Sequence, residues 1–436
     1  MNLIRWSVSK NRGLSRQWMI AIMGFILAFG LSGILSAFFP YAVRIEHDLW
    51  FGADVNRVIG NMVDPSSGHW RTYHHPLFSL SMLPLASPIF WAAKFVGFQP
   101  DIAKAIAAQL IVSFSAGITW ILIYVISLQM GLSIIQSFVI GLLFLSSSAF
   151  VFWWSTPETF PLGAPTILLP FLLLSLRVKS MRLWIIAIAA SGAMTITNFA
   201  AGFISAYIRF KAKKVFYSLC AAALISVSLL SVVQKAYLPN AQLGEINLLG
   251  ERKFIKRSFL PLNSLYGFFV TPVIAPSSPS LVNLNNLDRT TQDIYGKTML
   301  QLHFEVPTME DASLLRSGVA LTWMFFLING VYVAWFRRRN ATCIALIIFL
   351  VFQFFLHSIY GDSPFLYSAH YVPVMFLIAG YGLNSFRKSG SRLILLLAFL
   401  LTTILGILNV DALLSSFDIG LTYVDVTGPT TVKWCC

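Results

Sequence analysis

Charged residues are scarce in this chain. They make up 11% of its 436 residues, whereas a typical soluble domain carries about 25%. Hydrophobic residues make up 57% of the chain, which excludes a disordered protein and argues against a soluble fold or a nucleic-acid binder. Apolar runs of about 20 residues, the length of a membrane-spanning helix, recur along it. The composition therefore predicts an all-α polytopic membrane protein.

Cysteine is scarce too. Of the four cysteines, Cys220 and Cys343 lie in apolar runs, and Cys435 and Cys436 are adjacent. There is no evenly spaced framework and no CxxC pair, which argues against a disulfide scaffold and a cysteine-based zinc site. The histidines and carboxylates described below are candidate ligands for a divalent metal, but no spacing among them is diagnostic. The sequence therefore leaves metal binding unknown.

Positive charge predicts the topology. Lysine and arginine number 31 against 17 acidic residues, and most of the excess falls in five short clusters. Basic loops stay in the cytoplasm because lysine and arginine resist translocation. We therefore place the amino terminus and all five clusters inside, most simply in a bacterial inner membrane; a basic face that binds a partner is the alternative. The clusters occupy residues 5–16, 177–182, 209–214, 337–339 and 387–392.

About eleven spanning helices fit these constraints. Residues 76–98 are read as a juxtamembrane segment, because a crossing there would export the 177–182 cluster and because three prolines interrupt it. Residues 183–208 are read as a recessed hairpin with its turn near Asn198 and Gly202. The other spans are expected at 18–40, 103–128, 133–152, 161–176, 215–234, 317–336, 341–359, 369–386 and 393–409.

This topology divides the chain into a transmembrane domain, 1–409, and an extracytoplasmic tail, 410–436. The domain contains a first outer loop at 41–102, with juxtamembrane helices, and a long outer loop at 235–316. The long loop is rich in proline, asparagine and serine, a composition typical of irregular structure.

Polar residues concentrate on the predicted outer side. In the first outer loop, Asp54 and Arg57 are three residues apart, so a short helix would present both on one face. They form either a simple ion pair or a base beside a phosphate-binding cation. A second short outer loop carries Glu158 at the membrane edge. A third, 361–373, offers aromatic, hydroxyl and imidazole groups, which suit a sugar or a headgroup, or form an interfacial aromatic belt.

Several short motifs, in this chain order, make the sequence similar to the GT-C superfamily of integral-membrane glycosyltransferases, in its aminoarabinose transferase and protein O-mannosyltransferase-like branch. That branch has an acidic residue followed by arginine and methionine after its first span, then basic-Pro, acidic-Pro, Thr-Lys-Gly and Tyr-x-x-Pro elements. This sequence lacks the lysines of that pattern. The corresponding residues are Asp54, Arg57, Met62, His75-Pro76-Leu77, Glu158 before Pro161, Thr197-Asn198-Phe199, and His370-Tyr371-Val372-Pro373.

The resemblance implies transfer of a sugar from a polyprenyl-phosphate donor to a glycan, lipid or protein acceptor, on the extracytoplasmic face and among membrane lipids. The attacking hydroxyl must lose a proton, so one carboxylate base is needed; Asp54 is the candidate and Asp48 the alternative. The phosphate leaving group needs cations. Glu158 would position the base or the acceptor. Candidate substrate contacts are Arg57, Arg71, His74, His75, Lys253, Lys256, Arg257, His370 and Tyr371.

Two other functions stay open at this point. An O-antigen polymerase or ligase would also face outward, and Arg57 and Gly68 fit an Arg-x10-Gly spacing of the polymerase type, although a glycine occurs at a given offset about 7% of the time by composition alone. A non-enzymatic transporter would have charges near the middle of the membrane. The span centres are nearly free of charge, which disfavours a transporter.

Overall fold

The computed structural model describes residues 12–38, 49–243, 261–277, 279–283, 300–304, 313–337, 339–361, 364–383 and 391–427. Asp48, Lys253, Lys256 and Arg257 lie outside these ranges. Nearly everything described is helical, so the prediction of an all-α polytopic membrane protein is confirmed. The α-helices are α1 (Arg12–Ala37), α2 (Val55–Val63), α3 (Phe78–Phe95), α4 (Pro100–Gln129), α5 (Ile134–Leu145), α6 (Ser148–Trp153), α7 (Thr159–Ser175), α8 (Met181–Met194), α9 (Phe199–Arg209), α10 (Lys213–Tyr237), α12 (Pro261–Phe269), α13 (Leu314–Tyr332), α14 (Ala341–Ile359), α15 (Ser368–Leu383) and α16 (Ser391–Thr427).

Short irregular elements complete the description. A 3-10 turn, η2 (Ile196–Asn198), joins α8 to α9, and a π-helical turn, η5 (Val333–Arg337), extends α13. In the described parts of the long outer loop, β1 (Ser280–Asn283) and β2 (Leu300–His303) pair antiparallel. The described part of this predicted loop therefore contains a small ribbon and the helix α12.

Six helices in the described ranges are long and apolar enough to cross a membrane. They are Ser15–Ala37, Pro100–Gln129, Lys213–Tyr237, Leu314–Arg337, Ala341–Ile359 and Leu393–Thr422. The remaining predicted spans correspond to shorter helices: α5 has 12 residues, α7 has 17, α8 has 14 and α15 has 16. Of the roughly eleven predicted spans, six are therefore helices long enough to cross alone, and the others correspond to shorter apolar helices. The predicted span at 133–152, for example, is broken where Ser147 caps α6.

Two finer predictions hold. The segment 183–208 is a hairpin of α8 and α9 that turns at η2. The helix α3 occupies 78–95 with Pro84 and Pro88 inside it, and it is not among the candidate spans, in agreement with a juxtamembrane position.

The last helix differs from expectation. The α16 helix continues past residue 409 to Thr427, so residues 410–427 extend the span instead of starting a separate tail. Asn409, fully buried, anchors this helix. Its Oδ1 accepts from the Ala275 N–H at 2.8 Å, and its Nδ2 donates to the carbonyls of Ser146 and Val273 at 2.7 and 2.8 Å.

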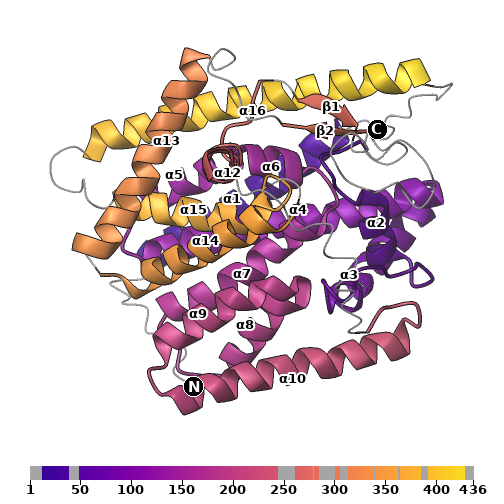
Figure 1. Cartoon of the computed structure of the whole chain (residues 1–436), viewed down its shortest axis with the longest axis horizontal. Coiled ribbons are helices and arrows are strands. Elements are labelled where there is room, and N and C mark those ends of the chain that lie inside the picture. The colour runs from indigo at the N-terminus through magenta and orange to yellow at the C-terminus, as the bar shows by residue number, and fades with distance from the viewer. Residues whose placement is uncertain are drawn as a thin grey trace.

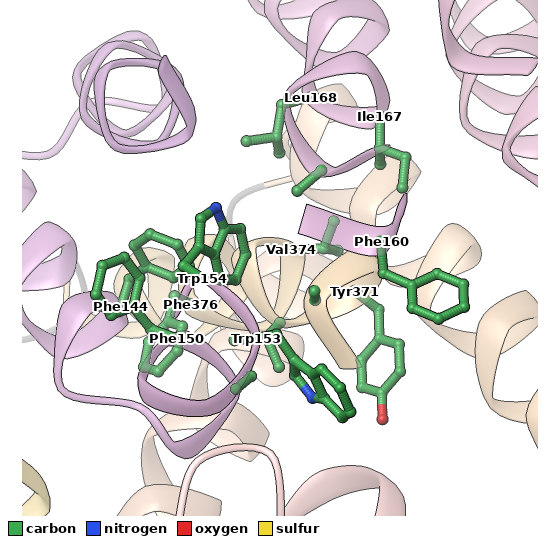
Figure 2. Packing of buried hydrophobic residues seen from close by; sticks show 14 of the residues in the cluster. Phe144, Phe150, Trp153, Trp154, Phe160, Ile167, Leu168, Tyr371, Val374 and Phe376 are labelled. Atoms are coloured by element: carbon green, nitrogen blue, oxygen red, sulfur yellow. The ribbon is translucent and has the colours of Figure 1, made fainter. Parts of the chain in front are cut away.

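Figure 1 shows α10 and α16 running along opposite sides of the molecule, with α7, α14 and α15 between them and with α2 and α3 gathered at one end. Aromatic side chains fill the interior (Figure 2). Phe150 stacks on Trp154 with ring centroids 5.6 Å apart, and Phe144 meets both rings edge-on. Phe144 also contacts Phe376 of α15. This packing ties α5 and α6 to α15, which is buried along its whole length.

Candidate active site

A tight turn presents Asp54. Phe51 and Gly52, at φ of 43° and 78°, both take the left-handed conformation, which is costly for a phenylalanine. Aromatic packing holds the turn: Trp50 is fully buried and stacks on Phe152, and Phe51 packs against the same ring. The chain then enters α2 with Asp54 at its N-cap. The turn is therefore anchored in the protein interior, and Asp54 follows directly from it.

Two guanidinium groups share one carboxylate oxygen. Arg57 lies one helical turn after Asp54, and its Nε and Nη2 are both 3.1 Å from Asp54 Oδ2. Arg71 Nη1 is also 3.1 Å from this oxygen. The predicted spacing of Asp54 and Arg57 on one helix face is thus confirmed, and Arg71 arrives from a separate segment. Arg57 Nη1 is buried and has no hydrogen-bond partner among the described residues.

Hydrogen bonds to Gln242 hold the segment that carries Arg71 in place. Arg71 takes a left-handed φ of 64°, and its backbone N–H donates to Gln242 Oε1 at 3.1 Å. Thr72 Oγ1 donates to the Gln242 carbonyl and accepts from the Gln242 N–H. Gln234 of α10 binds Pro76 and Leu80 in the same manner, from side chain to backbone. The end of α10 and the residues after it therefore fix the position of Arg71.

Glu158 holds the backbone of Asp54 through a hydrogen bond. It is the N-cap of α7 and is 1% exposed. Its Oε2 accepts from the Asp54 backbone N–H at 3.2 Å, and its Oε1 accepts from the N–H and hydroxyl of Thr159, both at 2.7 Å. The side chain of Glu158 thus joins the start of α7 to the start of α2.

Electrostatics separate the two carboxyl groups. Burial opposes ionisation of Asp54, but Arg57 and Arg71 outweigh it and lower the pKa of Asp54 below its ordinary value. Burial raises the pKa of Glu158, and the charge of Asp54 adds to this effect, although Arg57 and Thr159 oppose it. Carboxyl groups with pKa values moved in opposite directions are typical of sites that handle protons.

Burial favours the neutral form of two histidines, His75 and His69. Burial lowers the pKa of His75 well below 6.5, and the nearby Arg57 adds to the shift. His75 Nδ1 lies 2.7 Å from the Met194 carbonyl, so the proton is on Nδ1 and Nε2 is an acceptor. His69 is also buried, which lowers its pKa, and it bonds to Ser79 and Pro65 away from the cavity. His75 therefore offers a hydrogen bond but no positive charge.

These groups line one cavity of about 660 Å³, its open mouth included. One wall is charged and comes mainly from the first outer loop; the other is aromatic and comes from α14, α15 and their connection. The η2 turn closes a third side. The lining residues are Gly52, Asp54, Arg57, Arg71, His74, His75, Glu158, Phe160, Thr195, Ile196, Thr197, Leu356, His357, Tyr360, Leu366, Tyr367 and His370.

Of the predicted site residues that the structure describes, all but Tyr371 line this cavity. Asp54, Glu158, the two arginines, His74, His75 and His370 all line it. Tyr371 does not: it is fully buried, donates to the Pro364 carbonyl at 2.9 Å and stacks on Phe268. Successive residues of a helix point about 100° apart, so facing His370 into the cavity turns Tyr371 into the core.

Sequence reasoning missed much of the aromatic wall. Tyr367 lies in the stretch chosen for its aromatic and imidazole groups, but His357, Tyr360 and Leu366 were not singled out. His357 stacks on Tyr367 with centroids 4.3 Å apart. The sequence signal that could have identified His357 is its place near the end of the apolar run 341–359. A histidine at such a place is equally expected without any role in a site, because polar residues are common where an apolar run meets a loop.

The observed donor set does not fit a divalent metal. No group of three or more histidine, cysteine, aspartate or glutamate side chains is placed to hold one within the described ranges. Asp54 Oδ2 is taken by two guanidinium groups, and both oxygens of Glu158 accept hydrogen bonds. In this arrangement the carboxylates serve as acceptors for protein groups.

Comparisons with known proteins give structural likenesses but no sequence match. No family model matches the sequence, and no curated protein matches it. The crystal structure of the Archaeoglobus fulgidus oligosaccharyltransferase in complex with Zn and sulfate is similar, with a TM-score of 0.49 and 14% sequence identity. The match covers 93% of this chain and 56% of that one, so this chain spans little more than half of that protein's length. A likeness at this level carries no argument about function.

Proposed function

We propose that the protein is a membrane glycosyltransferase that moves a sugar from a polyprenyl-phosphate donor to a hydroxyl acceptor on a glycan, lipid or protein. The observation that carries this proposal is Asp54, an ionised carboxylate in a cavity, paired with two guanidinium groups beside an aromatic wall. A carboxylate, cations and a stacking surface are the three groups that such a transfer needs, and the cavity brings all three together.

The charged wall suits the phosphate. Guanidinium groups bind phosphate oxygens through paired hydrogen bonds, and Arg57 Nη1 is buried without a partner among the described residues. The helices α2, α7 and α15 also begin at the cavity, at Asp54, Glu158 and Ser368. Helix N-termini carry partial positive charge. A phosphate leaving group would gain negative charge beside these groups as the glycosidic bond breaks, and they would stabilise it.

Asp54 is placed to act as the base. Its Oδ2 is held by the two arginines, and its carboxylate is ionised at neutral pH because they lower its pKa. An arriving phosphate would draw the guanidinium groups toward itself, which raises the basicity of Asp54 at the moment when the acceptor hydroxyl must lose its proton. Glu158 holds the backbone of Asp54 and so acts as a positioning residue.

The aromatic wall suits the sugar. Phe160, Tyr367 and His357 form a continuous set of rings, with Phe160 and Tyr367 centroids 5.1 Å apart. Such rings present an apolar surface bordered by polar edges, which matches the face of a pyranose. The acceptor then enters through the open mouth of the cavity.

The proposed orientation follows from the charge clusters. The described helices alternate so that residues 177–182, residues 209–214 and Arg337 lie at helix ends opposite to those that form the cavity. Because basic clusters stay in the cytoplasm, the cavity opens on the extracytoplasmic face, and we place the protein in a bacterial inner membrane.

Reconstitution tests the proposal. Purified protein in liposomes should release polyprenyl phosphate from a polyprenyl-phosphate monosaccharide in the presence of an extract of envelope glycans and lipids, with the sugar recovered on the acceptor by mass spectrometry. Arg57→Ala should weaken binding of the donor, because it removes a phosphate contact. Absence of release with every hexose and pentose donor in a panel would contradict the proposal.

A further inference from the structure

Two buried polar side chains next to the cavity lack partners. His370, in the first turn of α15, lines the cavity and is 2% exposed, yet its Nε2 makes no hydrogen bond with any described residue. Asn198, on η2, is fully buried, and neither its Oδ1 nor its Nδ2 has a partner in the described part of the chain. Buried amide and imidazole groups are nearly always hydrogen-bonded, so these two point to a group that binds there.

Gly163 brings the two side chains together. A Cβ added to this glycine would lie 2.6 Å from His370 Nε2 and 3.3 Å from Asn198 Nδ2. The two nitrogens are therefore no further apart than the sum of these lengths, which two hydrogen bonds of about 3 Å to one shared oxygen atom can span. A side chain at position 163 would therefore crowd both nitrogens, and glycine leaves them uncovered on this side of α7.

The chemistry of this corner is neutral. The carboxamide of Asn198 offers both a donor and an acceptor, and imidazole Nε2 offers one or the other according to tautomer. The Asp54 carboxylate of the cavity is paired with Arg57 and Arg71 and not with His370 or Asn198. Phe160 packs edge-on against His370, with ring centroids 4.9 Å apart, and also contacts the ring of His75. A hydroxyl group, which both donates and accepts, matches this pair, whereas an ammonium or carboxylate finds no counter-charge.

We propose that His370 and Asn198 form a specificity subsite that holds one hydroxyl group of the transferred sugar, and that the donor therefore carries a neutral sugar with a free hydroxyl at that position. This inference rests on the proposed function, because it assigns the sugar moiety to the cavity. His370 contacts the hydroxyl from the cavity side, and Asn198 completes its hydrogen bonding from the side of η2.

The test measures coupling between a protein group and a sugar hydroxyl. The probes are citronellyl phosphate, its mannosyl, glucosyl and galactosyl derivatives, and deoxy forms of the best binder that each lack one hydroxyl. Affinities are measured by calorimetry on the full chain in detergent. At least one glycosylated probe should bind the wild-type protein about tenfold tighter than citronellyl phosphate, the scale expected for about one well-made hydrogen bond that lacks an alternative partner. One deoxy form should lose this advantage.

Variants then locate the contact. His370→Phe and Asn198→Leu should lose the advantage of the full sugar and become insensitive to the same deoxy change, while citronellyl phosphate binds as in the wild type. His370→Gln should retain part of the advantage. Gly163→Ala should remove it while both polar side chains remain. Thermal unfolding identifies any variant that fails to fold, and His370→Gln and Gly163→Ala then carry the test.

The outcomes separate this inference from the proposed function. If all glycosylated probes bind the wild type no better than citronellyl phosphate, or if no deoxy form weakens binding, the subsite does not exist. If the deoxy effect persists unchanged in His370→Phe and Asn198→Leu, the hydroxyl is held elsewhere and the assignment is wrong. Hydroxyl-dependent binding without transfer activity would support the subsite and refute the transferase; transfer without such coupling would do the reverse.

Discussion

Replacing Asp54 by asparagine should weaken transfer and strengthen anion binding at the same time. In the resting cavity the Asp54 carboxylate occupies the position between Arg57 and Arg71 where we expect the donor phosphate, and it competes with that phosphate for both cations. Asparagine keeps the shape but removes the competing charge. It also cannot accept the acceptor's proton, so transfer should fall by about 10²-fold or more.

The size of the gain follows from two ion pairs. At 3.1 Å and an effective dielectric constant of 20, Coulomb's law gives roughly 5 kcal/mol per pair before screening and desolvation. The side chains of Asp54 and Arg71 are 36% and 41% exposed, and measured pairs at such exposure contribute only about 0.2–1 kcal/mol. Two pairs thus give about 0.4–2 kcal/mol, and 1.4 kcal/mol, in the upper half of that range, corresponds to about tenfold in affinity.

Calorimetric titration of citronellyl phosphate into purified protein measures this gain. Asp64→Asn is the matched control: Asp64 lies in the same loop and pairs with Lys104 at 2.8 Å, but it does not line the cavity. We expect the dissociation constant to fall about tenfold for Asp54→Asn and to stay unchanged for Asp64→Asn. Equal or weaker binding by Asp54→Asn would refute the idea that Asp54 competes for the anion site, and wild-type transfer would refute its role as the base.

Three further predictions concern groups around the cavity. Glu158→Gln should lower kcat about tenfold with little change in the donor KM, because one amide oxygen cannot accept from both Asp54 and Thr159 as the carboxylate does; initial-rate kinetics on the reconstituted protein measure this, and an unchanged kcat would show that Asp54 needs no such support. Stability should fall below about pH 6.5, because the folded-state pKa of His75 is depressed below the unfolded value, so its contribution is complete above that value and is lost as the pH falls. Melting curves of wild type and His75→Gln between pH 8 and 5 should show the smaller acid loss in the variant, and identical losses would contradict this account. Tyr371→Phe should cost about 0.5–1.5 kcal/mol of stability through its lost hydrogen bond to Pro364 while leaving the affinity for citronellyl phosphate unchanged; a large loss of affinity would return Tyr371 to the site.

The sequence allowed the all-α polytopic class and the charged half of the candidate site to be predicted, because both follow from local patterns. Asp54 and Arg57 are one turn apart, and the position of Glu158 at the start of an apolar run already placed it at a helix end. The contribution of Arg71 depends instead on Gln242, which is 171 residues away in sequence. Likewise, the approach of His370 to Asn198 depends on Gly163. Such long-range contacts arise from how helices pack, and no local pattern in one sequence encodes them.

The boundary of the last helix was missed for a different reason. Residues after 409 include Asp411 and Asp418, and such charged residues are typical of a polar segment that follows a span. In the structure, Arg316 pairs with Asp411 and Phe417 packs against Trp50. Tertiary contacts of this kind override the local polarity of a segment, and they extend α16 to Thr427.

The lengths of α7 and α15 have a consequence for the cavity itself. At 1.5 Å per residue, their 17 and 16 residues rise about 26 and 24 Å, against a hydrocarbon core of about 30 Å. Each lacks roughly one turn, and both start at the cavity, with Phe160 and His370 in their first turns. One more turn on either helix would fill this space with backbone. The short lengths of α7 and α15 leave room for the cavity at their first turns, and inserting four residues before Thr159 or Ser368 should close it.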